Sequence, residues 1–217
     1  MSETLSVANT WRSLRIGDTA PGFTARTTCG ERSLKDYRSR WLLLFAHPAD
    51  FTPVCTSEFV SLAKAKPQFD ALSCDLLGIS VDGLYSHLAW LRDIRRHFDV
   101  TVDFPIIEDP SMAIAMAYGM LDPQAPDASA VRACYVIDPE GIVRAITWYP
   151  MNVGRSVAEQ LRLIRALQAT DATGASTPEG WEGDGPLLAP APLSLDASVS
   201  DDAGAPWYYQ TVARDAP

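Results

Sequence analysis

The sequence is poor in cysteine and histidine, and the few present form no recognisable disulfide or metal pattern. There are four cysteines and three histidines in 217 residues, with no Cys-x-x-Cys pair and no spacing typical of a zinc site. These absences disfavour a thiol–disulfide oxidoreductase, and we expect neither a metal nor another cofactor. In a reducing compartment, isolated cysteines are more often small buried apolar residues than disulfide partners.

Basic residues and long apolar runs are also scarce. Lys and Arg number 18 against 27 Asp and Glu, which gives a formal net charge of -9 and a pI near 4.7. This balance disfavours a nucleic-acid partner, because binding to phosphates needs clustered basic side chains. No apolar run approaches the roughly 20 residues of a membrane helix, and residues 1–5 lack the pattern of a signal peptide. We therefore expect a cytoplasmic protein with no membrane partner.

Hydrophobic periodicity predicts an α/β fold. Apolar runs indicate buried strands at residues 41–46 and 76–81, and a segment with helical spacing follows each of them. The first helix should begin near Pro53 and end by Pro67. The second helix has this expected apolar face: Leu84, Leu88, Leu91, Ile94 and Phe98.

The other expected elements complete the pattern of a thioredoxin-like fold. They are a hairpin at 22–34, an extended segment at 104–107, a short helix at 112–118, a hairpin of 132–138 with 142–148, and a last helix at 157–168. Early strands that alternate with helices favour parallel pairing, and the late hairpin adds antiparallel strands. The order is β-α-β-α followed by β-β-α.

A change in composition near residue 170 predicts two parts, a thioredoxin-like domain at 1–169 and a C-terminal extension arm at 170–217. The arm is rich in Ala, Pro, Gly, Ser and Asp, and holds eight acidic residues against one base, Arg214. Such a segment is not expected to bury a core of its own. It is either a flexible tail or an arm that packs on a partner subunit, and its aromatic residues favour the arm: Trp181, Trp207, Tyr208 and Tyr209.

The stretch from His47 to Thr56 carries the clearest chemical signal. Cys55 lies where the first strand gives way to the first helix. Free backbone N–H groups and the positive end of the helix dipole favour a thiolate there. A thiolate near neutral pH is a nucleophile, so Cys55 is the candidate catalytic residue.

Reduction of a peroxide by such a thiolate needs fixed donors around the sulfur. Thr52 lies one helical turn before the cysteine, so its hydroxyl can face the sulfur and the incoming peroxide. Pro48 fixes the loop and can shield the site from water. Glu58 can orient a guanidinium, and Arg132, at the start of a late strand, is the best candidate for that cation.

The motif Pro48-x-x-x-Thr52-x-x-Cys55 resembles the active-site signature of peroxiredoxins, and the string from His47 to Thr56 resembles the one-cysteine subfamily in particular. Similar segments continue from about residue 17 into the tail, including 77–82, 104–109, 132–138 and 177–181. The resemblance implies a thiol-dependent peroxidase that reduces hydrogen peroxide and organic hydroperoxides.

The resemblance also implies roles for individual residues. Cys55 would be the peroxidatic cysteine that is oxidised to a sulfenic acid. Thr52 and Arg132 would activate it, with Pro48 and Arg132 contacting substrate. Arg155 matches a second arginine of the family that supports the pocket, and His47 matches a histidine of the one-cysteine group.

The implied partners are a peroxide, an external reductant and a second copy of the chain. No cysteine follows Cys134, which favours regeneration by an external thiol, another small reductant or a thioredoxin-like protein. The family commonly forms homodimers or assemblies of dimers, with the arm reaching across to the partner. The alternative function is a peroxide-sensing or holdase-type assembly protein that uses the same cysteine.

Simpler interpretations stay open for several residues. Arg155 could pair locally, and His47 could only hydrogen-bond the loop. Seven further residues are expected to have no role in catalysis. The expected bystanders or packing residues are Cys29, Cys74, Cys134, Phe51 and Val54. The two remaining histidines, His87 and His97, are expected to be solvated on their helix.

Overall fold

A computed structural model describes residues 14–121, 130–194 and 206–213 of the chain. The described residues fall into two compact units. One comprises the residues up to 66 together with 73–155, and the other comprises 67–72 together with the residues from 156 onward. The sequence-based division at residues 169 and 170 stays a prediction. No helix of the described part has the length and apolar character needed to cross a membrane.

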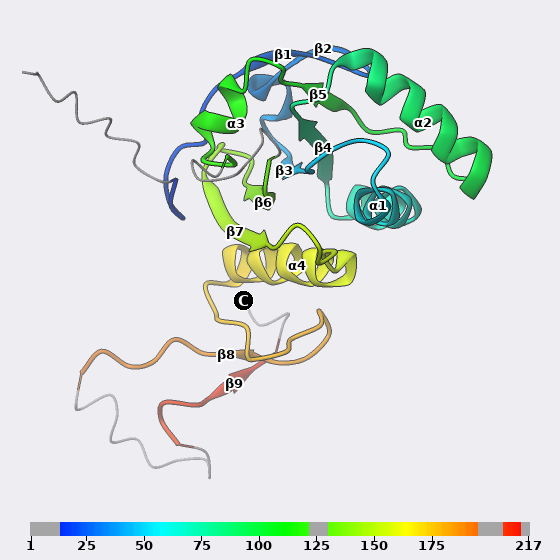
Figure 1. Cartoon of the computed structure of the whole chain (residues 1–217). Helices are drawn as coiled ribbons and strands as arrows, with labels where there is room; N and C mark the ends of the chain where they lie inside the picture. Colours follow the sequence, from blue (N-terminus) through cyan, green and yellow to red (C-terminus); the bar gives the residue numbers. More distant parts are fainter. Residues whose placement is uncertain (1–13, 122–129, 195–205, 214–217) are drawn as a thin grey trace, which may run out of the picture. The chain divides into compact units, whose positions relative to one another are not determined.

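The first unit is built on a seven-stranded mixed sheet (Figure 1), with strands in the order β2-β1-β5-β4-β3-β6-β7. The strands are β1 Thr24–Thr27, β2 Gly30–Ser33, β3 Trp41–Ala46, β4 Cys74–Ser80, β5 Ile106–Glu108, β6 Arg132–Ile137 and β7 Val143–Tyr149. The central strands β3, β4 and β5 pair in parallel, whereas β6 and β7 form an antiparallel hairpin beside β3. The expected α/β pattern is confirmed.

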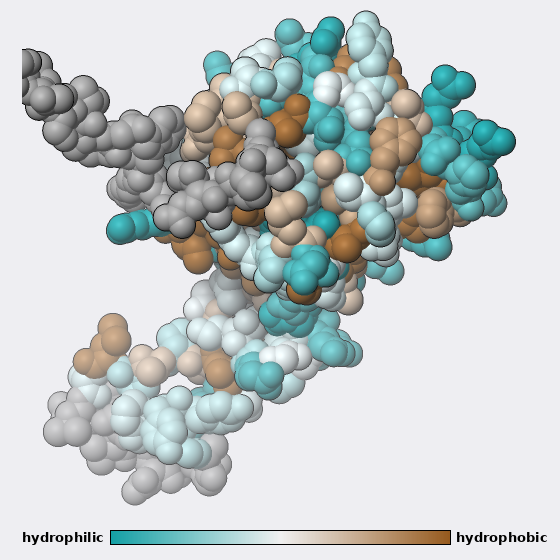
Figure 2. Space-filling view, in the orientation of Figure 1, coloured by the Kyte–Doolittle hydropathy of each residue, from teal (hydrophilic) through white to brown (hydrophobic). Residues whose placement is uncertain are grey.

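The central strand β3 is buried on both faces, which explains why it has no alternating polar residues. On one face Leu42 and Leu44 belong to a core that includes residues near α3 (Ala113–Ala117). On the other face Phe45 packs against Phe59 of α1 (Pro53–Ala71). Apolar side chains are mixed with polar ones on the face of the molecule seen in Figure 2, in keeping with a core that holds most of the large apolar residues.

The helix α1 continues past the point where we expected it to end. Pro67 lies inside the helix, which runs to Ala71. A proline in a helix interior removes one hydrogen bond and costs about 3 kcal/mol. Phe69 lies on the last turn of the helix and is 0% exposed. Its burial favours continuation of the helix beyond Pro67. The expected end at Pro67 was therefore wrong.

The helix α2 (Leu84–Phe98) buries a face that shares Ile94 with the expected one but is otherwise shifted. Its buried residues are His87, Trp90 and Ile94, spaced three and four apart, whereas Leu88 and Phe98 are 39% and 51% exposed. His87, expected to be solvated, is 0% exposed, so that prediction was wrong. His97 is exposed as expected.

The second unit contains α4 (Val157–Thr173) and the short strands β8 (Leu187–Leu188) and β9 (Thr211–Val212). Ser156 caps the start of α4, and Gly174 ends it in a left-handed conformation. Trp181 and Leu187 belong to a small core that also includes Ala166 and Ala169 of α4, so the segment after residue 170 buries its apolar residues together with that helix. Trp207, Tyr208 and Tyr209 are 46–66% exposed. Packing of the arm on a partner stays a prediction.

Candidate active site

Cys55 lies in the first turn of α1, directly after the loop that follows β3. Its side chain is 0% exposed. The strand delivers the loop to the carboxyl edge of the sheet, and α1 begins there at Pro53, whose missing N–H costs nothing in a first turn. The sulfur is thus held at the positive end of a 19-residue helix, which favours negative charge on it.

Arg132 reaches this sulfur from β6, which pairs antiparallel with β3. Its Nη1 lies 3.4 Å from Cys55 Sγ and 2.9 Å from Glu58 Oε2, and its Nε donates to the carbonyl of Met151 at 2.7 Å. The side chain is 3% exposed. The guanidinium is fixed by two acceptors besides the sulfur, so it is already oriented before any substrate arrives.

Glu58 joins the two arginines that we singled out. It accepts from the Nε, Nη2 and backbone N–H of Arg155 at 2.7–2.9 Å, and from Arg132. Arg155 also donates to the carbonyls of Ala46 and Ala133. Burial raises the pKa of Glu58, but the hydrogen bonds and charge of Arg155, with the charge of Arg132, outweigh this and lower it below its usual value.

We expect Glu58→Gln to lower stability at pH 6 by about 3–5 kcal/mol, because it leaves buried guanidinium charge uncompensated. The pKa of Glu58 is depressed in the folded protein. Its contribution is therefore fully present above the unfolded value of about 4.3 and is lost as the pH falls through the folded value. Urea midpoints of both proteins between pH 3 and 6 measure this. The difference should be largest at pH 6 and shrink below pH 4, and a difference independent of pH would contradict it.

Thr52 and Pro48 shape the loop before the cysteine. Thr52 Oγ1 donates to the carbonyl of Ala49 at 2.8 Å, and Pro48 is buried. We expected the hydroxyl both to donate and to accept at the sulfur. In this conformation its proton is used within the loop, so Thr52 offers only its lone pairs to a ligand.

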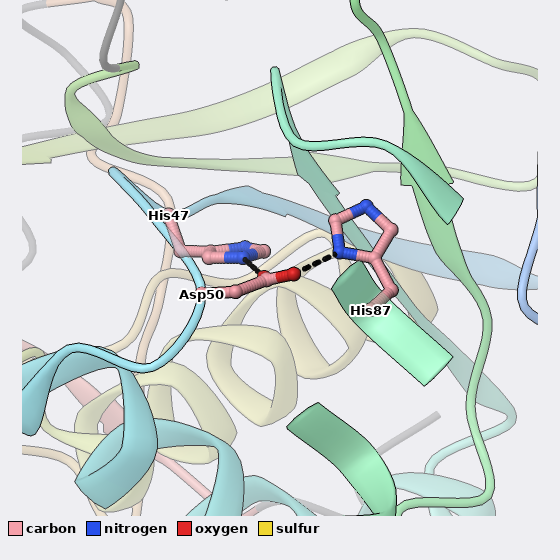
Figure 3. A group of neighbouring side chains, drawn as sticks. All are labelled: His47, Asp50 and His87. Carbon is pink, nitrogen blue, oxygen red and sulfur yellow. Dashed lines mark hydrogen bonds and ion pairs between the residues drawn. The ribbon is translucent and has the colours of Figure 1, made fainter. Parts of the chain in front are cut away.

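His47 belongs to a buried cluster with Asp50 and His87 (Figure 3). His47 Nε2 lies 2.9 Å from Asp50 Oδ1, and His87 Nδ1 lies 2.8 Å from Asp50 Oδ2. Burial lowers the pKa of His47 and outweighs its bond to Asp50, which keeps the ring neutral. Burial raises the pKa of Asp50, but the hydrogen bonds of both histidines outweigh it, so this pKa lies well below its usual value.

The same three residues have the chemistry and spacing of metal ligands, because their ligand atoms lie within 4.8 Å of one another. Each oxygen of Asp50 is already hydrogen-bonded to one ring nitrogen, and a cation would have to displace both bridging protons. The two histidines are therefore joined through Asp50, and the buried Nδ1 of His47 has no hydrogen-bond partner among the described residues.

The remaining cysteines lie in different environments. Cys134 is buried on β6, and Arg155 Nη1 lies 3.5 Å from its sulfur. Burial raises the pKa of the Cys134 thiol. Cys74 is buried at the start of β4, and Cys29 is exposed. The bystander role of all three stays a prediction.

Asp50 and His87 were missed in the sequence. The spacing His47-x-x-Asp50 placed a carboxylate near the histidine, and His87 stands three residues before Trp90 and seven before Ile94. That helical spacing was the available signal for a buried histidine.

Comparison with known proteins gives concordant results. The AhpC/TSA family profile matches residues 16–146, more than half of the chain. Peroxiredoxin 2 of Thermoplasma acidophilum is 41% identical over 201 residues, which cover 91% of this chain and 100% of the relative. A peroxiredoxin of Ignicoccus hospitalis is 48% identical over 167 residues, or 76% of this chain and 71% of the relative.

Solved structures agree with these relatives. A yeast mitochondrial 1-Cys peroxiredoxin has a TM-score of 0.78 at 43% identity, covering 84% of this chain and 90% of that one. Peroxiredoxin 6 of Arenicola marina has a TM-score of 0.78 at 29% identity, and the match covers 85% of this chain and 87% of that one. The expected thioredoxin-like fold is confirmed.

Proposed function

The chain belongs to the AhpC/TSA family and is a peroxiredoxin, a thiol-dependent peroxidase, and from this premise we propose that Cys55 is the thiol that attacks the peroxide. The observation that carries this assignment is the contact of 3.4 Å between Cys55 Sγ and the buried guanidinium of Arg132. The similarity to peroxiredoxins favours turnover over the peroxide-sensing or holdase-type alternative.

In the proposed step, the thiolate sulfur of Cys55 bonds to one oxygen of the peroxide. The O–O bond breaks, and the other oxygen leaves with the bonding electron pair as alkoxide or hydroxide and takes up a proton. Sulfur is thereby oxidised to the sulfenic acid Cys–S–OH, and the peroxide is reduced to an alcohol or water. Arg132 stabilises negative charge on sulfur before the step and on the departing oxygen during it.

Access to the sulfur requires a small movement of the protein. Cys55 is 0% exposed, so a peroxide reaches its sulfur only when residues around it shift. The Ala49 carbonyl orients the hydroxyl of Thr52. We propose that the oxygen of this hydroxyl accepts a hydrogen bond from the peroxide. Pro48 is the proposed apolar wall that keeps water from the sulfur.

The direct test is to oxidise the purified protein with hydrogen peroxide and to monitor the reaction by stopped-flow fluorescence. A peroxidase should react with hydrogen peroxide orders of magnitude faster than free cysteine at the same pH. Intact-mass spectrometry after one equivalent of peroxide should show one added oxygen atom, located on Cys55 by peptide mapping. A rate equal to that of free cysteine, or oxygen located on another cysteine, would overturn the assignment.

We further propose a one-cysteine cycle. An external thiol attacks the sulfenic sulfur, which forms a mixed disulfide and releases water, and a second thiol then restores Cys55. The yeast relative is described as resolved via glutathione/thioredoxin systems, which supports a reductant of this type. Assembly as a homodimer and a cytoplasmic location remain predictions, and sedimentation analysis tests the first.

Simultaneous replacement of Cys29, Cys74 and Cys134 by serine should leave peroxide turnover within about threefold of wild type, because no thiol other than Cys55 takes part. The measurement is steady-state consumption of peroxide with an excess of a small thiol. Each variant must keep the wild-type circular dichroism spectrum. Loss of turnover in the folded triple variant would reveal an internal resolving cysteine.

A further inference from the structure

The loop that presents Cys55 is tied to the rest of the first unit through Asp50. The carboxylate of Asp50 is bonded to His47 within the loop and to His87 on α2. Its backbone N–H donates to the carboxylate of Asp82 at 3.0 Å, and Asp82 also accepts from the hydroxyl of Ser80. One residue of the loop is therefore anchored on two sides, by elements more than thirty residues away in the sequence.

The anchor on α2 is buried and has two hydrogen-bonding contacts. Both ring nitrogens of His87 face oxygen atoms, Asp50 Oδ2 at 2.8 Å and the carbonyl of Ile107 at 3.2 Å. The side chains of His87 and Asp50 are 0% and 1% exposed, so water does not compete for the contact between them.

The anchor stands beside a strained residue. Phe51 has a φ of +56°, in the left-handed region that an aromatic residue rarely adopts. Its side chain does not hold it there by packing, since the residue is 55% exposed. Such a conformation persists only when its surroundings impose it. Asp50 precedes Phe51, and Thr52 follows it with its hydroxyl bonded back to Ala49.

We propose that His87 is a positioning residue of the peroxide site: it clamps Asp50 and thereby holds the left-handed turn at Phe51 that sets Thr52 and Cys55 opposite Arg132. This inference rests on the proposed function of Cys55. It assigns to α2 a role in catalysis without any contact to substrate, and it explains why a histidine occupies the buried face of that helix. The cluster in Figure 3 is then a clamp on the loop.

The test is the rate of oxidation of Cys55 by hydrogen peroxide in His87→Phe, which keeps a ring but loses both ring nitrogens. We expect the second-order rate constant to fall roughly 10- to 100-fold, because displacement of reacting groups by about 1 Å has effects of that size. His87→Asn, which keeps one donor, should recover most of the loss. His97→Asn, on the same helix but exposed and bonded to Asp93, is the matched control and should equal wild type.

Two further measurements separate positioning from a merely structural role. All rates are taken well below the melting temperature of each variant. Alkylation of Cys55 by iodoacetamide, which needs no aligned O–O bond, should slow less than oxidation does. In a Phe51→Gly background, which relieves the turn, the loss caused by His87→Phe should be smaller than in wild type. Equal losses in both reactions, or additive effects with Phe51→Gly, would overturn the clamp.

The remaining outcomes are also decisive. If His87→Phe does not fold, the oxidation rate of Cys55 is measured in Asp50→Asn instead, and the same loss of rate is expected. A fast wild type with an equally fast His87→Phe overturns the clamp alone, whereas a wild type as slow as free cysteine overturns the proposed function. One equivalent of zinc in the purified protein that is lost in His87→Phe would show a metal site in place of the hydrogen-bonded clamp.

Discussion

Replacement of Cys55 by serine is expected to reduce peroxide turnover by at least about 10⁴-fold, the scale on which the loss of an enzyme nucleophile acts. A serine hydroxyl stays protonated at neutral pH. Neither the positive N-terminal end of α1 nor the guanidinium of Arg132 can therefore make it a comparable nucleophile. The side chain is almost the same size, and the fold should be retained. Peroxide consumption with excess thiol measures the effect.

A matched control for this variant lies in the same sheet. Cys134 is also buried and also lies beside an arginine, with Arg155 Nη1 at 3.5 Å from its sulfur. Cys134→Ser should nevertheless keep turnover close to wild type, because burial raises the pKa of this thiol and keeps it protonated. Retained turnover in Cys55→Ser, or its loss in Cys134→Ser, would exchange the roles of the two thiols.

The part of the site that could be predicted from the sequence is the part encoded locally. The strand at residues 41–46 is an uninterrupted apolar run, and the helix starts at a proline, so the place of Cys55 at their junction follows from neighbouring residues. Local rules failed at Pro67, where α1 continues because later residues such as Phe69 are buried. Tertiary packing overrode the breaking tendency of a single proline.

His87 shows a different limit. Hydropathy placed the apolar face of α2 on its leucines, because a histidine counts as polar. Its burial depends on Asp50, which lies 37 residues earlier and supplies the partner for its ring. A buried polar side chain is stable only when it is hydrogen-bonded, and periodicity within one helix holds no information about a partner on another element.

Arg132 was proposed from its place at the start of a late strand, and Arg155 was identified through the resemblance as a support of the pocket, but the contacts of the two side chains could not be predicted. Arg132 touches the sulfur, whereas Arg155 binds Glu58 through three groups and also reaches two backbone carbonyls. Arg132 stands two residues before Cys134, which lies opposite Phe45 where β6 pairs with β3. Strand register across a sheet depends on long-range packing, which spacing along one segment does not determine.

Arg132→Met should slow the oxidation of Cys55 by roughly 10²- to 10³-fold, the usual effect of removing one preorganised donor from a reacting centre. The fold should survive the change, because Glu58 keeps its contacts with Arg155 and is not left as an unpaired buried charge. Stopped-flow oxidation by hydrogen peroxide measures the rate. Arg144→Met, on β7 and paired with Asp138, is the control and should leave the rate unchanged.

Arg132→Lys separates charge from geometry at the same position. Lysine keeps a positive charge but has no planar fork, so it cannot bond Glu58, the Met151 carbonyl and the sulfur together. If the guanidinium acts through its charge alone, the lysine variant should oxidise at nearly the wild-type rate. We expect a rate between those of Arg132→Met and wild type, because the fixed orientation of the donors contributes beside the charge. If Arg132→Met oxidises as fast as wild type, the guanidinium has no part in the reaction. The contact of Arg132 with the sulfur would then no longer support the assignment of Cys55.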